Sequence, residues 1–354
     1  MLERLFPTLS RFRLAVQLLM LVVTVYGSVF VGSYMADKIS NALPALSCAY
    51  DQMNGGYCVL IPTQHILHHR IGEAMVRAQQ LTLTMVLPLL MSFAVFFAFF
   101  FVLGKAFCGW VCPLGTLQEV LGRVGRRFGV GLRRFSADDL GRTQRVRPVK
   151  WLILLGLVFL LPLLTGLGVT PHALGNPYCD VCPARIATTL LTGSTEQFAV
   201  PIDDKVKFIL GATANFLFGF IILAALAVRQ PFCRICPLLA FNSLAQRLSP
   251  MRLVKTRHDN CGKCSICTEA CSMDIPEISE EEGRKAYSED CTLCGRCAEY
   301  CPQDGTIQLK WGPFSLFSSR RDYYKAKLVS ELPDGTVKPL KFVRGASKAT
   351  RADA

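Results

Sequence analysis

Long apolar runs alternate with polar segments along this chain, and the runs are the first guide to its fold. Four of them are long enough to cross a lipid bilayer, which takes about 20 mainly apolar residues in a helix. None contains Asp, Glu, Lys or Arg, and they are Leu14–Ala36, Leu81–Leu103, Trp151–Thr170 and Phe208–Val228. The pattern predicts an α-helical membrane protein with four transmembrane helices.

The first run follows Arg4, Arg11 and Arg13, which is also the arrangement of a secretory signal peptide. It is too long for the apolar region of such a peptide, and no small-residue cleavage site follows it. We therefore interpret it as a retained membrane anchor.

Composition and charge agree with a membrane protein. Hydrophobic residues make up 51% of the 354 residues and charged residues 18%, a balance that suits a membrane protein better than a soluble one. The net charge is +13, and segment 104–150 holds ten Lys or Arg against three acids, whereas segments 37–80 and 171–207 hold few. The positive-inside rule then places both termini, segment 104–150 and everything after Arg229 in the cytoplasm, beneath a bacterial inner membrane. Clustered arginine also occurs in nucleic-acid binding proteins, but here it flanks membrane spans and no nucleic-acid motif accompanies it.

Eight of the sixteen cysteines form two tandem runs toward the C-terminal end. Each run has the spacing C-x2-C-x2-C-x3-C, and Pro302 follows the second. Bacterial two-cluster ferredoxins have this spacing, and the fourth cysteine of each run ligates the other cluster. The rule predicts one [4Fe–4S] cluster on Cys261, Cys264, Cys267 and Cys301, and a second on Cys291, Cys294, Cys297 and Cys271.

Structural zinc is the alternative, because paired C-x2-C motifs also form zinc sites. Zinc would leave the third and fourth cysteines of each run unexplained, so the iron–sulfur interpretation is favoured. Ser272 stands where a proline is usual after the first run, which changes the local turn but removes no ligand.

A shorter cysteine motif recurs in the membrane part. It occurs as Phe107-Cys108-Gly-Trp-Val-Cys112-Pro113, Tyr178-Cys179-Asp-Val-Cys182-Pro183 and Phe232-Cys233-Arg-Ile-Cys236-Pro237. The first and third lead into amphipathic stretches, whose apolar positions are Leu114, Leu117, Val120, Leu121 and Val124, and Leu238, Leu239, Phe241, Leu244 and Leu248. With a further pair at Cys48 and Cys58, the order span, outer pair, span, inner pair, surface helix occurs twice, in residues 1–128 and 149–250.

A parallel repeat of this kind places equivalent positions around an axis along the membrane normal. Two sets of four cysteines follow: an inner, cytoplasmic set of Cys108, Cys112, Cys233 and Cys236, and an outer set across the membrane of Cys48, Cys58, Cys179 and Cys182. Free cysteine is often a small buried apolar residue, but matched pairs at helix ends favour a metal or a third iron–sulfur cluster at the inner set. For the outer set, a further metal centre and the disulfides Cys48–Cys58 and Cys179–Cys182 are equally open, since that compartment is oxidising.

The motif from Phe107 to Gly115, the later C-x2-C-P-Leu phrase and the two ferredoxin runs together resemble a known family. It is the membrane-bound [4Fe–4S] polyferredoxin family typified by NapH, the C-terminal half of NosR, and CcoG, and the resemblance covers residues 80–310. It implies a four- to six-span protein that moves electrons between the quinone pool or the cytosol and a partner redox enzyme or metal centre. The chain departs from the family pattern at Cys233-Arg-Ile-Cys236, which is one residue shorter than the usual C-x3-C-P, and in its outer cysteine set.

Polar residues cluster ahead of the second predicted span. His65, His68, His69 and Glu73 lie in the first outer loop, and His172 lies in the second. Such groups can take protons from a quinol, or ligate haem or copper; the alternative, which we favour, is ordinary solvation at the membrane surface. No C-x2-C-H haem motif, P-loop or Rossmann glycine pattern occurs in the sequence, so nucleotide use is unsupported.

The sequence thus divides into a four-helix membrane domain (1–250), a small α+β two-cluster ferredoxin-like domain (251–310) and a basic tail (311–354), in which Leu328–Val343 has the pattern of a hairpin. The expected function is electron transfer between the quinone pool, or a cytoplasmic donor, and a partner redox enzyme, as a quinol dehydrogenase or an electron-transfer subunit. The alternatives are an assembly reductase that delivers electrons to a metal centre or disulfide of another enzyme, and an iron–sulfur redox sensor.

Overall fold

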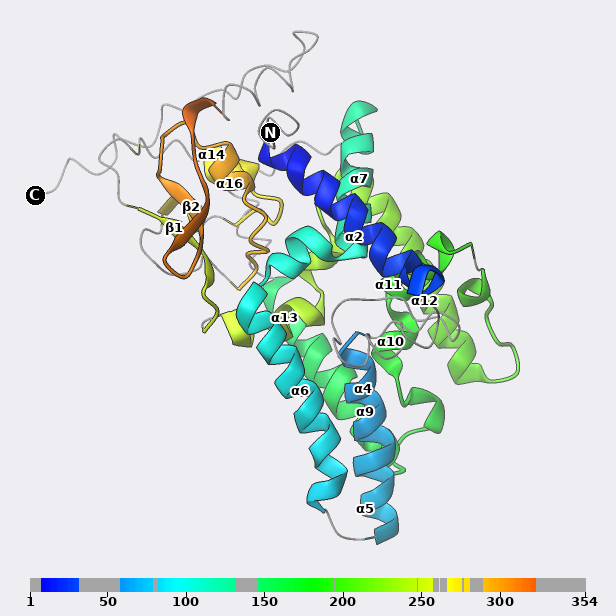
Figure 1. Cartoon of the computed structure of the whole chain (residues 1–354). Coiled ribbons are helices and arrows are strands. Elements are labelled where there is room, and N and C mark those ends of the chain that lie inside the picture. Colours follow the sequence, from blue (N-terminus) through cyan, green and yellow to red (C-terminus); the bar gives the residue numbers. More distant parts are fainter. Residues whose placement is uncertain are drawn as a thin grey trace, which may run out of the picture.

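The larger part of the molecule is helical, and a small three-stranded sheet with short helices lies at one end of it (Figure 1). The computed structural model describes residues 8–31, 58–78, 82–130, 146–193, 195–246, 248–256, 261, 266–275, 277–280 and 289–322. The N-terminal end of the first helix lies beside the small domain.

Four helices in the described part of the chain are long and apolar enough to cross a membrane, which confirms the predicted number of spans. They are α2 (Leu9–Val31), α6 (Leu83–Leu103), the continuous helix Val146–Gly166 and α12 (Lys205–Ala227). The third includes a π-helical stretch, η3 (Leu154–Leu160), and ends in α9 (Leu161–Gly166).

Each of these helices has a face that packs inside the protein and a face of exposed apolar side chains. In α6, Phe96 is fully buried while Leu90 is 50% exposed. In α12, Phe216 and Leu223 are 71% and 68% exposed. Large contiguous apolar surface marks a contact with lipid or with another protein, so the exposed faces fit a bilayer.

The polar segment ahead of α6 is a helix packed inside the bundle, which corrects the expectation of a solvated loop. It consists of α4 (Leu60–His65), the π-helical η1 (Ile66–Gly72) and α5 (Glu73–Ala78). Leu60 shares a buried core with Phe96 and Phe100 near the end of α6, whereas Ile71 packs with Leu89 in its first half. The helix therefore begins deep in the bundle and runs antiparallel to α6.

The segment between the third and fourth spans also folds inward. It contains η4 (His172–Leu174), α10 (Pro177–Val181), α11 (Pro183–Leu191) and η5 (Glu196–Phe198). Tyr178 joins the core around Phe96, while Ala184 and Ala187 pack with Ile221 of α12. Irregular backbone is tolerated within a membrane protein where it is buried in protein or lines a cavity.

Each Cys-Pro phrase opens a helix. α7 (Pro113–Arg127), α11 and α13 (Pro237–Gln246) all begin at the proline that follows the second cysteine. Proline suits this position because its φ is preset for a helix and its missing N–H would have had no partner there. The first cysteines lie in the short helices η2 (Phe107–Val111), α10 and η6 (Phe232–Arg234). The cysteine pairs are thus held at helix N-terminal ends, and α7 and α13 cover the predicted amphipathic stretches up to Gln246.

The small domain is built on an antiparallel sheet in the order β1-β2-β3. Its strands are β1 (Met251–Lys255), β2 (Ile307–Trp311) and β3 (Phe314–Ser318), and its helices are α14 (Ile266–Ala270), α15 (Glu277–Glu280) and α16 (Arg296–Glu299). Leu253 pairs with Leu309, and both are buried against Cys271, Cys291 and Cys297. The tail hairpin predicted at Leu328–Val343 lies outside the described residues.

Candidate metal centres

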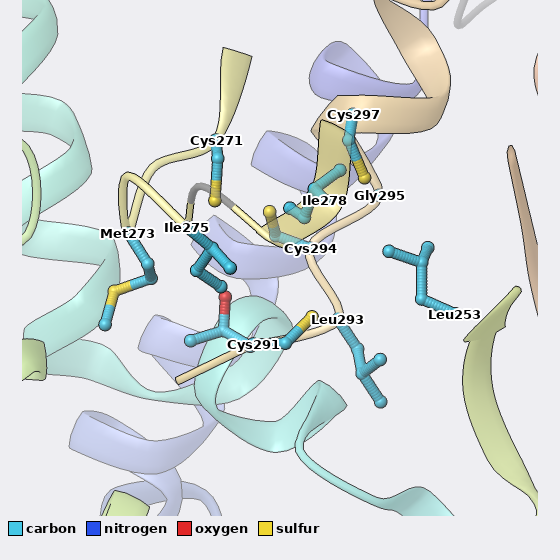
Figure 2. Close-up of a pocket in the computed structure, with 11 residues that line it drawn as sticks. Leu253, Cys271, Met273, Ile275, Ile278, Cys291, Leu293, Cys294, Gly295 and Cys297 are labelled. Carbon is cyan, nitrogen blue, oxygen red and sulfur yellow. The ribbon is translucent and has the colours of Figure 1, made fainter. Parts of the chain in front are cut away.

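The four cysteines expected to hold the second ferredoxin cluster surround one cavity. Cys271, Cys291, Cys294 and Cys297 line an empty volume of about 290 Å³, together with apolar side chains such as Ile275 (Figure 2). Three of them come from the loop and helix 291–297, and Cys271 comes from the end of α14. The fold therefore places around one pocket the four cysteines that the spacing rule assigns to the second cluster.

The backbone of the cysteine loop explains how its thiols share one cavity. Leu293 and Gly295 have φ angles of 51° and 74°, in the left-handed region. Glycine adopts this conformation without cost, whereas it is uncommon for leucine. The two left-handed residues turn the chain tightly between Cys291 and Cys297, so that it curls around the cavity.

The charge state of these thiols suits a metal site. Burial raises the pKa of Cys271 and of Cys297, and it raises the pKa of Cys291 to about 11, against the backbone N–H of Leu293 and the nearby Lys105. Buried thiols are therefore protonated until a cation replaces their protons, as metal binding requires. None of the fourteen described cysteines forms a disulfide. Four cysteine thiols around one pocket fit a [4Fe–4S] cluster.

The other ferredoxin set is described only in part. Cys261, Cys267 and Cys301 are described, whereas Cys264 lies outside the described residues. Cys301 is buried in the core of the small domain, and Cys267 packs against that core.

The inner cysteine set lines a second, larger cavity in the membrane part. Cys108, Cys112, Cys233 and Cys236 all border it, and its empty volume is about 810 Å³. Burial raises the pKa of Cys233, and the neighbouring Cys112 and Cys108 raise it further. The structure therefore brings both inner pairs to one place.

The outer cysteines border the same cavity, so their expected position across the membrane is wrong. Cys58, Cys179 and Cys182 line it beside the inner set, while Cys48 lies outside the described residues. The physical reason is the inward course of the helix 60–78 and of α10, which carries these residues back toward the end of α6 that adjoins Phe107. Cys179 and Cys182 form no disulfide.

Two buried glutamines hold the two sets in the same way. Gln64 Nε2 donates to the Leu60 carbonyl (3.0 Å) and to Cys179 Sγ (2.9 Å), and its Oε1 accepts from the Tyr178 N–H (3.2 Å). Gln118 Nε2 donates to the Leu114 carbonyl (3.2 Å) and to Cys233 Sγ (3.7 Å), and its Oε1 accepts from the Phe232 N–H (3.0 Å). Each residue in the contacts of Gln118 lies 54 positions after the matching residue in the contacts of Gln64. The same step of 54 positions separates Cys58 from Cys112 and Cys182 from Cys236. Sequence reasoning missed the glutamines, although the shared spacing Cys-x5-Gln would have shown them.

Tyr178 lies between the two sets. Burial raises its pKa, and Cys182, Cys236 and Cys58 raise it further because a charge on any of them would repel a phenolate. The Cys182 thiol is 3.8 Å from the Tyr178 hydroxyl. The two cysteine sets are therefore neighbours with one aromatic side chain at their boundary.

The cavity also touches the small domain. Thr292, which follows Cys291 in the cysteine loop, is part of its lining. Trp110 Nε1 donates to the Leu293 carbonyl (3.1 Å), and a Cβ on Gly109 would lie 2.5 Å from the Thr292 carbonyl oxygen. Cys108, Cys233 and Cys236 pack against the core that holds Cys271 and Cys291. The ferredoxin-like cysteines and the membrane cysteines thus share one continuous packed region.

Basic residues of the membrane part hold the small domain in place. Lys150 pairs with Glu289 (2.9 Å) and with Asp290, and Arg147 pairs with Glu277 (2.7 Å) and Asp290 (2.6 Å). Three further basic residues contact the small domain: buried Lys105 donates to the Glu289 carbonyl, Arg234 pairs with Asp274, and Arg13 donates to the Cys294 carbonyl (3.4 Å). The sequence interpretation assigned this charge to topology alone. Glu289 and Asp290, directly before Cys291, are the feature of the sequence that could have indicated contacts between the small domain and these basic residues.

The histidines group differently from the expected set. His68, His69, Glu73 and His172 place one donor atom each within 4.8 Å of one another. His65 lies beside His69, with ring centroids 4.6 Å apart, but outside this group. His172, which the sequence places 99 positions after Glu73, completes the cluster.

A comparison with known protein families finds matches in the two parts of the chain that carry the inner cysteines. The family described as a 4Fe-4S binding domain matches the chain twice, at residues 85–131 and 210–256. The matches include Cys108 and Cys112, then Cys233 and Cys236, and both end before Cys261. They therefore concern the membrane motif and not the ferredoxin runs.

Curated relatives match a little more than half of this chain. The protein MJ0750 of Methanocaldococcus jannaschii is 28% identical over 57% of the chain and 71% of its own length. The putative electron transport protein YccM of Escherichia coli is 26% identical over 58% of the chain and 51% of its own length. The ferredoxin-type protein NapH of Escherichia coli is 23% identical over 58% of the chain and 63% of its own length. The chain thus spans between half and two thirds of these last two relatives, and no solved structure matches it significantly.

The membrane helices, the paired motifs and the match to a 4Fe-4S binding domain define the class of membrane iron–sulfur proteins. The chain is similar to members of the membrane-bound polyferredoxin family, as the resemblance of its motifs predicted.

Proposed function

We propose that this protein relays electrons between the quinone pool, or a cytoplasmic donor, and a partner redox enzyme. The observation that carries the proposal is the continuous packing of its cysteine sets. Thr292 of the loop 291–297 borders the membrane cavity, and the inner set lines that cavity together with the described outer cysteines, Cys58, Cys179 and Cys182. A series of redox sites in contact is what an electron relay needs.

The ligand sets of the proposal follow the cysteine groups. In the small domain they are Cys261, Cys264, Cys267 and Cys301, and Cys271, Cys291, Cys294 and Cys297; in the membrane part they are Cys108, Cys112, Cys233 and Cys236, and Cys48, Cys58, Cys179 and Cys182. Clusters held there would take up and release single electrons, at potentials set by hydrogen bonds, charge and solvent exposure. The protein's own part is to bury the thiols, to exclude water and to donate hydrogen bonds to sulfur from Gln64 and Gln118.

The repeated contacts of the two glutamines support equal roles for the two membrane sets. Because Cys58, Cys179 and Cys182 occupy positions 54 residues before Cys112, Cys233 and Cys236, a cluster at one set implies the same geometry at the other. With the small domain in the cytoplasm, a site that its Thr292 borders lies near the side of the membrane where clusters are assembled.

The proposed location is a bacterial inner membrane with both termini in the cytoplasm. The small domain lies at the start of α2 and of the helix Val146–Gly166, and at the ends of α6 and α12, so all four spans alternate consistently (Figure 1). Its basic docking residues lie on the same side, as the positive-inside rule expects. Reporters fused after Ala354 and inserted near Gly55 test this; an external Ala354 reporter would overturn it.

Iron and acid-labile sulfide analysis, with low-temperature electron paramagnetic resonance, tests the ligand sets. Four [4Fe–4S] clusters correspond to about sixteen irons per chain. The variants Cys264→Ser, Cys271→Ser, Cys236→Ser and Cys182→Ser are each expected to lose about four irons and one signal, because each removes a ligand of a different set. Reduction of the purified protein by a quinol analogue then tests the donor.

Met273→Leu is the matched control, because Met273 lines the small-domain cavity beside Cys271 but belongs to no cysteine set. It should keep all of the iron. Full iron content and an unchanged spectrum in Cys236→Ser or Cys182→Ser would remove the membrane sites from the proposal. The same result in Cys271→Ser would remove the second ferredoxin cluster.

A further inference from the structure

We propose that His68, His69, Glu73 and His172 form a binding site for a divalent transition-metal ion, separate from the cysteine sites. Glu73 Oε1 is the common neighbour: it lies 2.8 Å from His69 Nδ1, 3.6 Å from His68 Nε2 and 3.7 Å from His172 Nε2. Donor atoms about 2.0–2.1 Å from a tetrahedral ion lie about 3.3 Å from one another. The observed spacings fall on both sides of that value, so small side-chain movements would enclose an ion.

The second observation is a buried ring with no hydrogen-bond partner. The His68 side chain is 2% exposed, and neither of its ring nitrogens has a hydrogen bond in the structure. A buried polar group without a partner costs free energy, and a metal ion would use the nitrogen that faces Glu73. Arg77 lies 3.4 Å from the other carboxylate oxygen, Oε2, and so leaves Oε1 to the imidazoles.

The local backbone is shaped for this cluster. The π-helical η1 carries a hydrogen bond from the Glu73 N–H to the His68 carbonyl, an i to i+5 step that sets Glu73 above both His68 and His69. Short π-helical stretches often occur at functional sites. A Cβ on Gly175 would overlap the His68 ring, and a Cβ on Gly166 would overlap the His68 carbonyl oxygen. Glycine at these two positions makes room for the buried ring.

The donor set indicates the class of ion. Imidazole nitrogens suit zinc, copper, iron and nickel, whereas calcium and magnesium prefer oxygen ligands. Three imidazoles and one carboxylate correspond to a zinc-type tetrahedral site. The cluster lies one helical turn beyond Gln64, farther from the small domain than the cysteine cavity, and it is independent of the proposed iron–sulfur ligands.

Zinc binding to the purified full-length protein, with its clusters intact, tests the site. About one zinc per chain is expected beyond the cluster iron, with nitrogen and oxygen neighbours at about 2.0–2.1 Å in X-ray absorption and no sulfur shell near 2.3 Å. The His172→Ala and Glu73→Gln variants are expected to bind zinc at least tenfold more weakly. His172 is 76% exposed, so its removal should leave the fold intact.

His65→Ala is the matched control, since His65 stands next to His69 but outside the donor group. It should keep wild-type zinc affinity and iron content. Absence of zinc binding by the wild type, a sulfur shell around the zinc, or equal affinity in His172→Ala would each overturn the proposal. Iron content in the same samples separates this outcome from a failure of the iron–sulfur relay.

Discussion

At the scale of single residues, Gln64 and Gln118 connect the backbone to the cavity cysteines. Each is fully buried in the first turns of its helix. Its side-chain amide donates to a backbone carbonyl and to a cysteine sulfur, and accepts from a backbone N–H. Such a side chain both positions the cysteine and places a donor on its sulfur. Hydrogen bonds to cluster sulfur are among the factors that set reduction potential.

Replacing Gln118 by leucine is expected to lower the reduction potential of the site that includes Cys233, by an amount on the order of tens of millivolts, because the donor to sulfur stabilises the reduced, more negative state. Redox titration followed by electron paramagnetic resonance measures the shift. Gln246→Leu, at a buried position outside the cavity lining, should leave the potential unchanged. An unshifted signal in Gln118→Leu would contradict the role given to its N–H.

Glu119 should make stability depend on pH. Burial by itself raises its pKa, but Arg13, Arg296 and Arg123 outweigh burial and lower the pKa to about 2 from the ordinary 4.5. A carboxyl group with a lowered folded-state pKa contributes stability that is complete above pH 4.5 and is lost as the pH falls toward 2. Glu119→Gln should therefore be about 3 kcal/mol less stable at pH 7, since buried Arg13 loses its partner.

Thermal unfolding in detergent between pH 7 and pH 4 measures this. The difference between wild type and Glu119→Gln should narrow as the pH falls below 4.5, because only the wild type has a carboxyl group here, and its unfolded form takes up a proton before its folded form does. Asp203→Asn, at an exposed position, serves as the control and should follow the wild type. A difference that stays constant with pH would count against the ion pair as its source.

At the scale of elements, the spans could be predicted from the sequence and the inward helices could not. A membrane span can be predicted from a single continuous run of apolar residues, and each of the four predicted runs corresponds to a long apolar helix in the structure. The helix 60–78 buries Thr63, Gln64 and His68, which look like surface residues in any local pattern. Their reason for burial lies 115 positions away, at Cys179 and its neighbours. The cysteine sets were predictable as groups, but the depth of the outer set was not.

The inward helix depends on a glycine contact with the third span. A Cβ on Gly166 would lie 2.8 Å from the Gly72 Cα and would overlap the His68 carbonyl, so Gly166→Ala should cost about 1–3 kcal/mol of stability through overpacking. Gly156→Ala, in the same helix, meets nothing within 4 Å and should be neutral or stabilising by up to about 1 kcal/mol. Thermal unfolding in detergent compares the two, and equal stability would argue against the close packing.

At the scale of the whole molecule, the positive charge of the membrane part serves the small domain as well as topology. Arg147 and Lys150 lie at the start of the third span, and their partners Glu289 and Asp290 lie directly before Cys291. The contacts therefore hold the cysteine loop itself against the membrane cavity. Lys150 is completely buried, so removing its partner leaves a buried charge, which costs about 3–5 kcal/mol.

Charge reversal at this contact should uncouple the two domains without removing a cluster. We expect Lys150→Asp to slow electron passage between the membrane sites and the ferredoxin-like clusters, and to expose the connection near Ser249 to protease, while iron content stays at the wild-type level. The compensating double variant Lys150→Asp with Asp290→Lys should recover part of the rate, because it restores an opposite-charge pair. Lys205→Asp, at an exposed position at the start of α12, should change neither property. Rapid-freeze electron paramagnetic resonance after mixing with a quinol analogue measures the rate. A wild-type rate in Lys150→Asp would mean that docking of the cysteine loop does not limit the relay.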